Sequence, residues 1–193
     1  MPQLFTYCPR CAAPLADDFV FGRVRRRCRY CGFIQFQDPK VAVAGLVSDG
    51  ARVLLVRRAA LPAIGFWALP AGYMDADELP HEAVAREISE ETGITIEVLG
   101  LHSIAALAGW NERRGILLIY RGRPTGGALA ARDDVSDARW FAPAEIPWDA
   151  LAFESTAQVL REWVEQNRVT NDDATLQQSL RGAPFATKQS PPK

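Results

Sequence analysis

The most constraining feature of the chain is residues 72–94, which read GYMDADELPHEAVAREISEETGI. Pro80 is compatible with the first turn of a helix, and Gly93 can end that helix in a left-handed cap. The stretch therefore predicts a helix from about residue 79 to 92. Because successive residues turn by about 100°, Val84 and Ile88 lie on a common face that can pack into a core.

Three carboxylates lie together on the neighbouring face of this predicted helix. Glu87, Glu90 and Glu91 fall within one arc of about 100°. Like charges at these spacings repel by about 0.2–0.5 kcal/mol per pair, so the cluster weakens the helix unless a counterion is present. Hard oxygen ligands favour Mg²⁺ or Mn²⁺. We therefore expect a divalent cation here, the alternative being a solvated acidic face.

Composition indicates a globular protein with no general affinity for polyanions. The chain has 193 residues, 48% hydrophobic and 23% charged, enough for one sizeable core and a small appendage. Its net charge of −1 gives no overall attraction to nucleic acid or to an anionic membrane. We find no apolar stretch of membrane-spanning length and no secretory signal, so we expect a cytoplasmic protein without a membrane partner. One local exception is a basic run made of Arg23, Arg25, Arg26, Arg27 and Arg29.

The four cysteines predict a second metal site. They form two Cys-x-x-Cys pairs, Cys8 with Cys11 and Cys28 with Cys31, separated by 16 residues. This spacing is typical of a four-thiolate zinc site. A pair of disulfides is the alternative, but disulfides are rare in cytosolic proteins. Iron in the same cage also remains open.

The segment around these cysteines is too short to fold on a core of its own. Residues 7–36 would be stabilised by metal ligation, which predicts a structural role for Zn²⁺. We expect this ribbon to pack on its neighbouring domain or on a partner subunit. Nucleic-acid binding through the adjacent arginines is the less favoured alternative, because basic runs are usually solvated surface.

The rest of the chain predicts an α/β (α+β) fold with a mixed β-sheet. Apolar runs at 41–47 and 52–57 flank a turn and read as a hairpin. Two more strands are expected at 97–107 and 115–122, and another at 138–141. A last helix is predicted at 153–166 from apolar residues at helical spacing. The predicted domains are the ribbon at 1–37, a catalytic domain at 38–167, and a flexible polar tail at 168–193.

The stretch 72–94 also resembles the Nudix box. That family's pattern is Gly, five residues, Glu, seven residues, then Arg-Glu-apolar-any-Glu-Glu-any-Gly-apolar. The fixed positions are met here by Gly72, Glu78, Arg86, Glu87, Ile88, Glu90, Glu91, Gly93 and Ile94. The resemblance extends to Gly-x-Trp-x-Leu-Pro-x-Gly at 65–72 and to the last strand and turn at 138–147.

The ribbon narrows the resemblance to pyrophosphatases. Four cysteines before such a domain resemble the NADH pyrophosphatases and, more closely, zinc-ribbon Nudix proteins related to plant FAD pyrophosphatases. In the latter, a Leu-Ala-Phe-x-Ser segment opens the final helix, and residues 151–155 have this pattern here. The Ser-Gln-Pro-Trp-Pro-x-Pro-x-Ser stretch of the NADH group is not found, which weakens NADH as the preferred substrate.

The resemblance implies a mixed sheet between helices and a hydrolytic activity. The substrate would be a nucleoside diphosphate linked to another group, namely FAD, ADP-ribose, NADH or a similar dinucleotide, and the products two monophosphates. Glu87, Glu90 and Glu91 match the family's metal ligands, and the backbone carbonyl of Gly72 is expected to add another. Arg86, together with Glu78, is expected to hold these carboxylates in place.

The general base and the substrate contacts are less constrained. Related pyrophosphatases place another acid before the last strand, which corresponds here to Asp134; a surface-turn acid is the equal alternative, and Glu112 and Glu154 are reserves. Phe66 and Trp110 are the candidates for stacking on a nucleotide ring. Arg113 is the candidate for a phosphate contact.

Two other functions compete with hydrolysis of a free dinucleotide. One is removal of a nucleotide cap, such as an NAD cap, from RNA. The other is a non-catalytic nucleotide sensor, which would normally carry a damaged box. We also expect a homodimer, because related pyrophosphatases dimerise and a small ribbon needs a surface to pack against.

Overall fold

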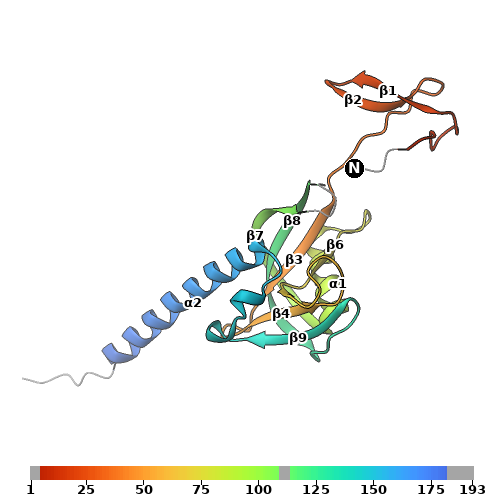
Figure 1. Cartoon of the computed structure of the whole chain (residues 1–193). Coiled ribbons are helices and arrows are strands. Elements are labelled where there is room, and N and C mark those ends of the chain that lie inside the picture. Colours follow the sequence, from red (N-terminus) through yellow and green to blue (C-terminus); the bar gives the residue numbers. More distant parts are fainter. Residues whose placement is uncertain (1–4, 109–113, 182–193) are drawn as a thin grey trace, which may run out of the picture.

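The computed structural model describes residues 5–108 and 114–181. The N-terminal ribbon contains a two-stranded antiparallel hairpin, β1 (Leu15–Val20) and β2 (Arg23–Cys28). It lies apart from the two larger sheets and is joined to them by the chain that enters β3 (Figure 1). Its small core contains Cys8, Leu15 and Cys28, so two of the four predicted zinc ligands are buried.

A four-stranded mixed sheet forms the centre of the domain. Its order is β6 (Ala71–Tyr73), β3 (Val41–Val47), β8 (Arg114–Gly127) and β7 (Ile94–Ala108). The pairing of β3 with β8 is parallel, whereas the other two pairings are antiparallel. The two strands predicted at 97–107 and 115–122 are confirmed; they are longer than expected, and they pair in antiparallel orientation.

A second sheet of three antiparallel strands lies beside it. Its order is β5 (Trp67–Ala68), β4 (Val53–Arg58) and β9 (Val135–Phe141). The predicted hairpin between 41–47 and 52–57 is wrong, because the two strands belong to different sheets and share only the isolated bridge between Ser48 and Val53. The physical reason is that β6 and β8 already occupy both edges of β3, so the turn carries the chain into the other sheet.

Two helices cover opposite faces of these sheets. Val43 and Val47 of β3 face α1 (Pro80–Thr92), whereas Ala44 and Leu46 face α2 (Glu154–Arg181). This alternation explains why β3 is a continuous apolar run, since it is buried on both sides. The predicted α/β (α+β) fold, a mixed sheet between helices, is confirmed. Short 3₁₀ turns at Pro143–Glu145 and Trp148–Ala150 lead into α2.

The last helix is longer than predicted. Val159, Leu160 and Trp163 pack into the core, as their spacing indicated, but α2 continues to Arg181 and extends past the sheets (Figure 1). Residues 154–181 contain no glycine or proline, so nothing local stops the helix after its packed part. The flexible tail and the domain boundaries remain predictions. No helix in the described part of the chain is long and apolar enough to cross a membrane.

Candidate active site

The helix α1 has the ends that the sequence predicts. Pro80 is in its first turn, and the Glu82 carboxylate accepts a hydrogen bond of 2.9 Å from the backbone N–H of Leu79. Gly93 ends the helix with φ of 69°, and its N–H donates to the Ser89 carbonyl at 2.9 Å. The predicted helix and its left-handed cap are confirmed.

The loop before β9 completes the C-terminal end of α1. The backbone N–H of Ala130 donates to the Thr92 carbonyl, and that of Arg132 donates to the Glu91 carbonyl, both at 2.9 Å. These bonds satisfy carbonyls that a helix end otherwise leaves free. They also bring Asp134, two residues later, to the Glu91 end of the helix.

One face of α1 lies directly on β3. Val84 and Ile88 are fully buried, and a Cβ atom on Gly45 would stand 2.3 Å from Ile88 Cδ1. The glycine therefore allows the helix and the strand to approach closely. This packing also positions the neighbouring face, which carries the glutamates, against β6.

Arg86 organises the acidic face. Its guanidinium donates to both carboxylate oxygens of Glu78, from Nε at 2.9 Å and from Nη2 at 2.5 Å. Nη1 donates to Glu87 Oε1 at 2.8 Å and to Glu90 Oε2 at 2.9 Å. The hydrogen bonds from Arg86 hold the pKa of Glu78 at about 2. One fixed cation thus orients three carboxylates.

Glu87 lies directly over Gly72, and any side chain at residue 72 would displace the Glu87 carboxylate. A Cβ atom at Gly72 would stand 2.1 Å from Glu87 Cδ and within 2.3 Å of both carboxylate oxygens. The Glu87 side chain is only 12% exposed, and burial raises its pKa. The carboxylate is therefore pressed against the backbone of β6.

Glu91 is the most buried of the three acids. It is 3% exposed, and its Oε2 accepts a hydrogen bond of 3.1 Å from the backbone N–H of Ala71. Burial, followed by the nearby charge of Asp134, raises the pKa of Glu91 to about 8. A cation bound here would offset both the burial of this carboxylate and its repulsion by the second acid.

The three glutamates do not converge in this arrangement as closely as the cysteines do. Within residues 5–108 and 114–181, the four cysteines are the one group of three or more potential ligands with donor atoms within 4.8 Å of one another. Arg86 instead occupies the position of counterion to Glu87 and Glu90.

The predicted substrate contacts are only partly described. Phe66 is 44% exposed directly before β5, whereas Trp67 beside it is buried and packs edge-to-face on Phe141. Trp110 and Arg113 lie outside the described residues, as does the reserve base Glu112. The other reserve, Glu154, accepts a hydrogen bond of 2.9 Å from Arg161.

Sequence reasoning missed Arg58. Its guanidinium lies 5.4 Å from the ring centre of Phe153, and Nε donates to the Pro62 carbonyl at 2.7 Å. Its charge lowers the pKa of Glu91, opposing the effect of burial. The one signal in the sequence is its place at the end of an apolar strand, next to Arg57.

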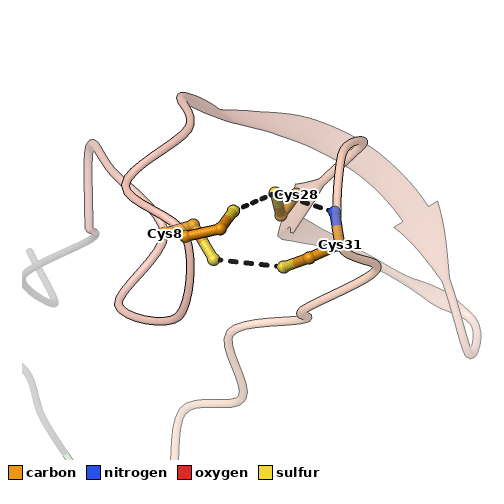
Figure 2. Close-up of side chains that lie close together, drawn as sticks. Cys8, Cys28 and Cys31 are labelled. Carbon is orange, nitrogen blue, oxygen red and sulfur yellow. Dashed lines mark hydrogen bonds between the residues drawn. The ribbon is translucent and has the colours of Figure 1, made fainter.

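The four cysteines form a compact thiol cluster (Figure 2). The Sγ atoms of Cys8 and Cys31 are 3.5 Å apart, as are those of Cys11 and Cys28. These distances are too long for disulfides. They are close to the ~3.8 Å edge of a tetrahedron with zinc–sulfur bonds of about 2.3 Å. The backbone N–H of Cys31 lowers the pKa of Cys28 to about 7, whereas the pKa of Cys11 is raised to about 12, through desolvation and the neighbouring thiols.

Comparison with known proteins identifies relatives of the catalytic domain. The model of the NUDIX domain matches residues 38–165. An ADP-ribose pyrophosphatase of Methanocaldococcus jannaschii is 32% identical over 129 residues, which are 66% of this chain and 76% of that protein.

Two further relatives cover more of the chain. The NAD-capped RNA hydrolase NudC of Stutzerimonas stutzeri is 28% identical over 172 residues, 88% of this chain but only 59% of its own length. The crystal structure of a NUDIX hydrolase from Nitrosomonas europaea superimposes with a TM-score of 0.76 at 27% identity, covering 84% of this chain and 92% of that one. Both matches cover a larger share of this chain than residues 38–165, which the family model matches, would occupy alone.

Proposed function

The chain belongs to the Nudix family of hydrolases, and from this premise we propose that it hydrolyses the pyrophosphate bond of a nucleoside diphosphate linked to another group. The first candidate substrate is ADP-ribose, and FAD and NADH follow. The products would be two monophosphates. The activity of the M. jannaschii relative supports this choice of substrate class.

The observation that carries the proposal is the packing of Glu87 against Gly72. A side chain at residue 72 would overlap this carboxylate, so the site excludes a Cβ atom where an oxygen ligand is needed. Arg86 then fixes Glu87 and Glu90 from the other side through Nη1. A structural salt bridge would need neither the glycine nor a shared donor.

The donor set fits Mg²⁺ or Mn²⁺. We propose that the cation is held by Glu87, Glu90, Glu91 and the Gly72 carbonyl. These ligands are hard oxygen donors of the kind that both ions prefer. Burial raises the pKa values of both Glu87 and Glu91, and a bound cation would favour their ionised forms. When bound, the cation would neutralise the diphosphate and lower the pKa of an attacking water.

The chain's own side chains then have separate tasks. Arg86 positions the carboxylates through its fork with Glu78. Asp134 is our candidate for the base that accepts the proton of the attacking water, because its charge acts on Glu91 and its side chain is exposed. Phe66, Trp110 and Arg113 remain proposed substrate contacts.

The experiment is hydrolysis of ADP-ribose, FAD and NADH with Mg²⁺ or Mn²⁺, followed by chromatography of the products. Glu90→Gln should cut turnover by orders of magnitude without changing the fold. Glu82→Gln is the matched control, because it removes one charge from the same helix and an amide oxygen can still cap it. Activity retained in Glu90→Gln would overturn the ligand assignment. Binding without turnover in the unmodified protein would favour a nucleotide sensor.

A second candidate substrate is NAD-capped RNA. The observation in its favour is the match to NudC over 88% of this chain, which is more than the catalytic domain provides. Including an NAD-capped oligonucleotide in the same panel separates the two. A capped RNA that is turned over faster than ADP-ribose would make decapping the principal activity.

A further inference from the structure

The ribbon concentrates positive charge in a protein that is otherwise acidic. Residues 1–37 contain six arginines and two aspartates, although the whole chain has 22 basic and 23 acidic residues. The ribbon stands apart from the sheets, so this charge is presented on a separate module (Figure 1). Such a local excess attracts a polyanion even when the net charge of the chain does not.

The arginines of β2 are sorted by the hairpin onto one face. Arg23, Arg25 and Arg27 alternate along the strand, so they share a face, with neighbours about 7 Å apart. Arg26 lies on the other face, where it pairs with Asp17 at 3.5 Å. A regular row of cations at this interval suits the successive phosphates of an extended strand.

Aromatic rings lie beside this row. Arg25 stands 5.3 Å from the ring centre of Phe36, and the rings of Phe36 and Phe21 are stacked with centres 6.3 Å apart. Phe21 is 75% exposed and Phe36 53% exposed. We call Arg23, Arg25, Arg27, Phe21 and Phe36 together the arginine face. Exposed rings of this kind have no role in the small core of the ribbon.

The charges of the arginine face are weakly compensated. Arg27 pairs with Asp18 at 3.2 Å, a partly exposed contact that contributes little to stability. Within the described residues, no acidic partner is found for Arg23. A groove of about 340 Å³ is lined in part by Arg23, Arg25 and Phe36, and also by Val24 and Arg26 of the other face. Asp17 and Asp38 line it as well.

We propose that the arginine face of the ribbon binds single-stranded nucleic acid. Phosphates would contact the arginine row, and an unstacked base would lie on Phe21. A duplex offers the charge but no free base faces, and a peptide of aspartate and glutamate alone offers the charge but no flat rings. Single strands therefore use both features of this surface.

The test is fluorescence anisotropy of the full-length, metal-loaded protein with a labelled 12-nucleotide oligouridylate over a range of salt concentrations. Each phosphate contact on a single strand contributes about −0.7 to the slope of log affinity against log salt, so three arginines predict about −2. Arg23→Gln should make this slope shallower by about 0.7. Arg161→Gln, which removes the same charge from the exposed surface of α2, should leave the slope unchanged.

The aromatic contribution has its own matched pair. Phe21→Leu should weaken binding about tenfold, because it removes a stacking ring and keeps an apolar side chain of similar size. Phe19→Leu is the control, since Phe19 is 72% exposed on the opposite face of the same hairpin, opposite Val24. Zinc content and ADP-ribose hydrolysis measured in every variant show that the fold is retained.

Three results would overturn the proposal. The first is binding that is equal in the arginine-face variants and their controls. The second is a duplex of the same length that binds as tightly as the single strand, since stacking on Phe21 would then contribute nothing. The third is absence of oligonucleotide binding together with a dimer, detected by sedimentation, that Phe21→Leu dissociates; this would assign the surface to a second copy of the chain.

Discussion

Replacing Gly72 with alanine should separate the activity of this protein from its stability. The added Cβ atom would stand about 2.2 Å from the Glu87 carboxylate, whereas ordinary contact begins at 3.4 Å. The carboxylate must therefore retreat by about 1.2 Å. A displacement of about 1 Å at a catalytic group can cost 10²-fold in rate. We expect kcat/KM for the best substrate to fall about a hundredfold.

The stability of the Gly72→Ala variant should change little. The obstructed atoms are the far end of a flexible side chain, so the helix and strand need not move. Alanine in a strand gains about 0.5–1 kcal/mol over glycine, which offsets much of the loss of the 2.8 Å hydrogen bond between Arg86 and Glu87. The melting temperature should stay within about 3 °C of the unmodified protein.

Gly45→Ala is the matched control, because it places a Cβ atom under the same helix. There the added atom would stand 2.3 Å from Ile88 Cδ1, which is fully buried and cannot retreat into solvent. Overpacking of this kind costs about 1–3 kcal/mol, or about 3–9 °C in melting temperature. Calorimetry and steady-state kinetics on both variants provide the comparison. If Gly72→Ala keeps activity within threefold, the position of Glu87 is not set by this glycine and our account of the site is wrong.

Three further outcomes are expected. The pKa of Glu78 in the folded protein is about 2, below the ordinary 4.5, so its paired hydrogen bonds with Arg86 stabilise the protein above pH 4.5 and this contribution is lost as pH falls through 2. Glu78→Gln should therefore flatten the decline in melting temperature between pH 6 and pH 3. An unchanged profile would contradict the stabilising role of these hydrogen bonds. Cys28→Ser should release the ribbon zinc, measured by elemental analysis, while zinc retained at the level of the unmodified protein would argue against a four-thiolate site. Sedimentation should detect a homodimer, and a monomer at every concentration would refute that expectation.

The sequence predicts the parts of this protein in which one residue determines the local structure. Pro80 and Gly93 define α1, and its acidic face follows from helical spacing alone. The pairing of β3 is different, because a buried strand can join any neighbour and the short turn after it suggested the wrong one. The length of α2 was also missed, since apolar spacing reports only the part of a helix that packs.

The candidate site shows the same division. Arg86 and the glutamates are adjacent along one helix, so their proximity is readable from the sequence. Arg58 comes from a strand of the other sheet, where it pairs with Val135, and its guanidinium stacks on Phe153, a contact between residues 95 positions apart. No periodicity reports such a contact. Asp134 was a candidate only through resemblance, and what the structure adds is that the loop before it is hydrogen-bonded to the end of α1.

That loop separates what can vary in this protein from what is fixed. The carbonyls of Thr92 and Glu91 accept hydrogen bonds from the backbone N–H groups of Ala130 and Arg132. Every residue except proline supplies a backbone N–H group. Substitution in this segment should therefore be tolerated over evolutionary time. Insertion or deletion should not, because one residue more or less would shift Asp134 along the helix end. Related chains that share the reaction should thus differ here in the identity of their residues and agree in their number.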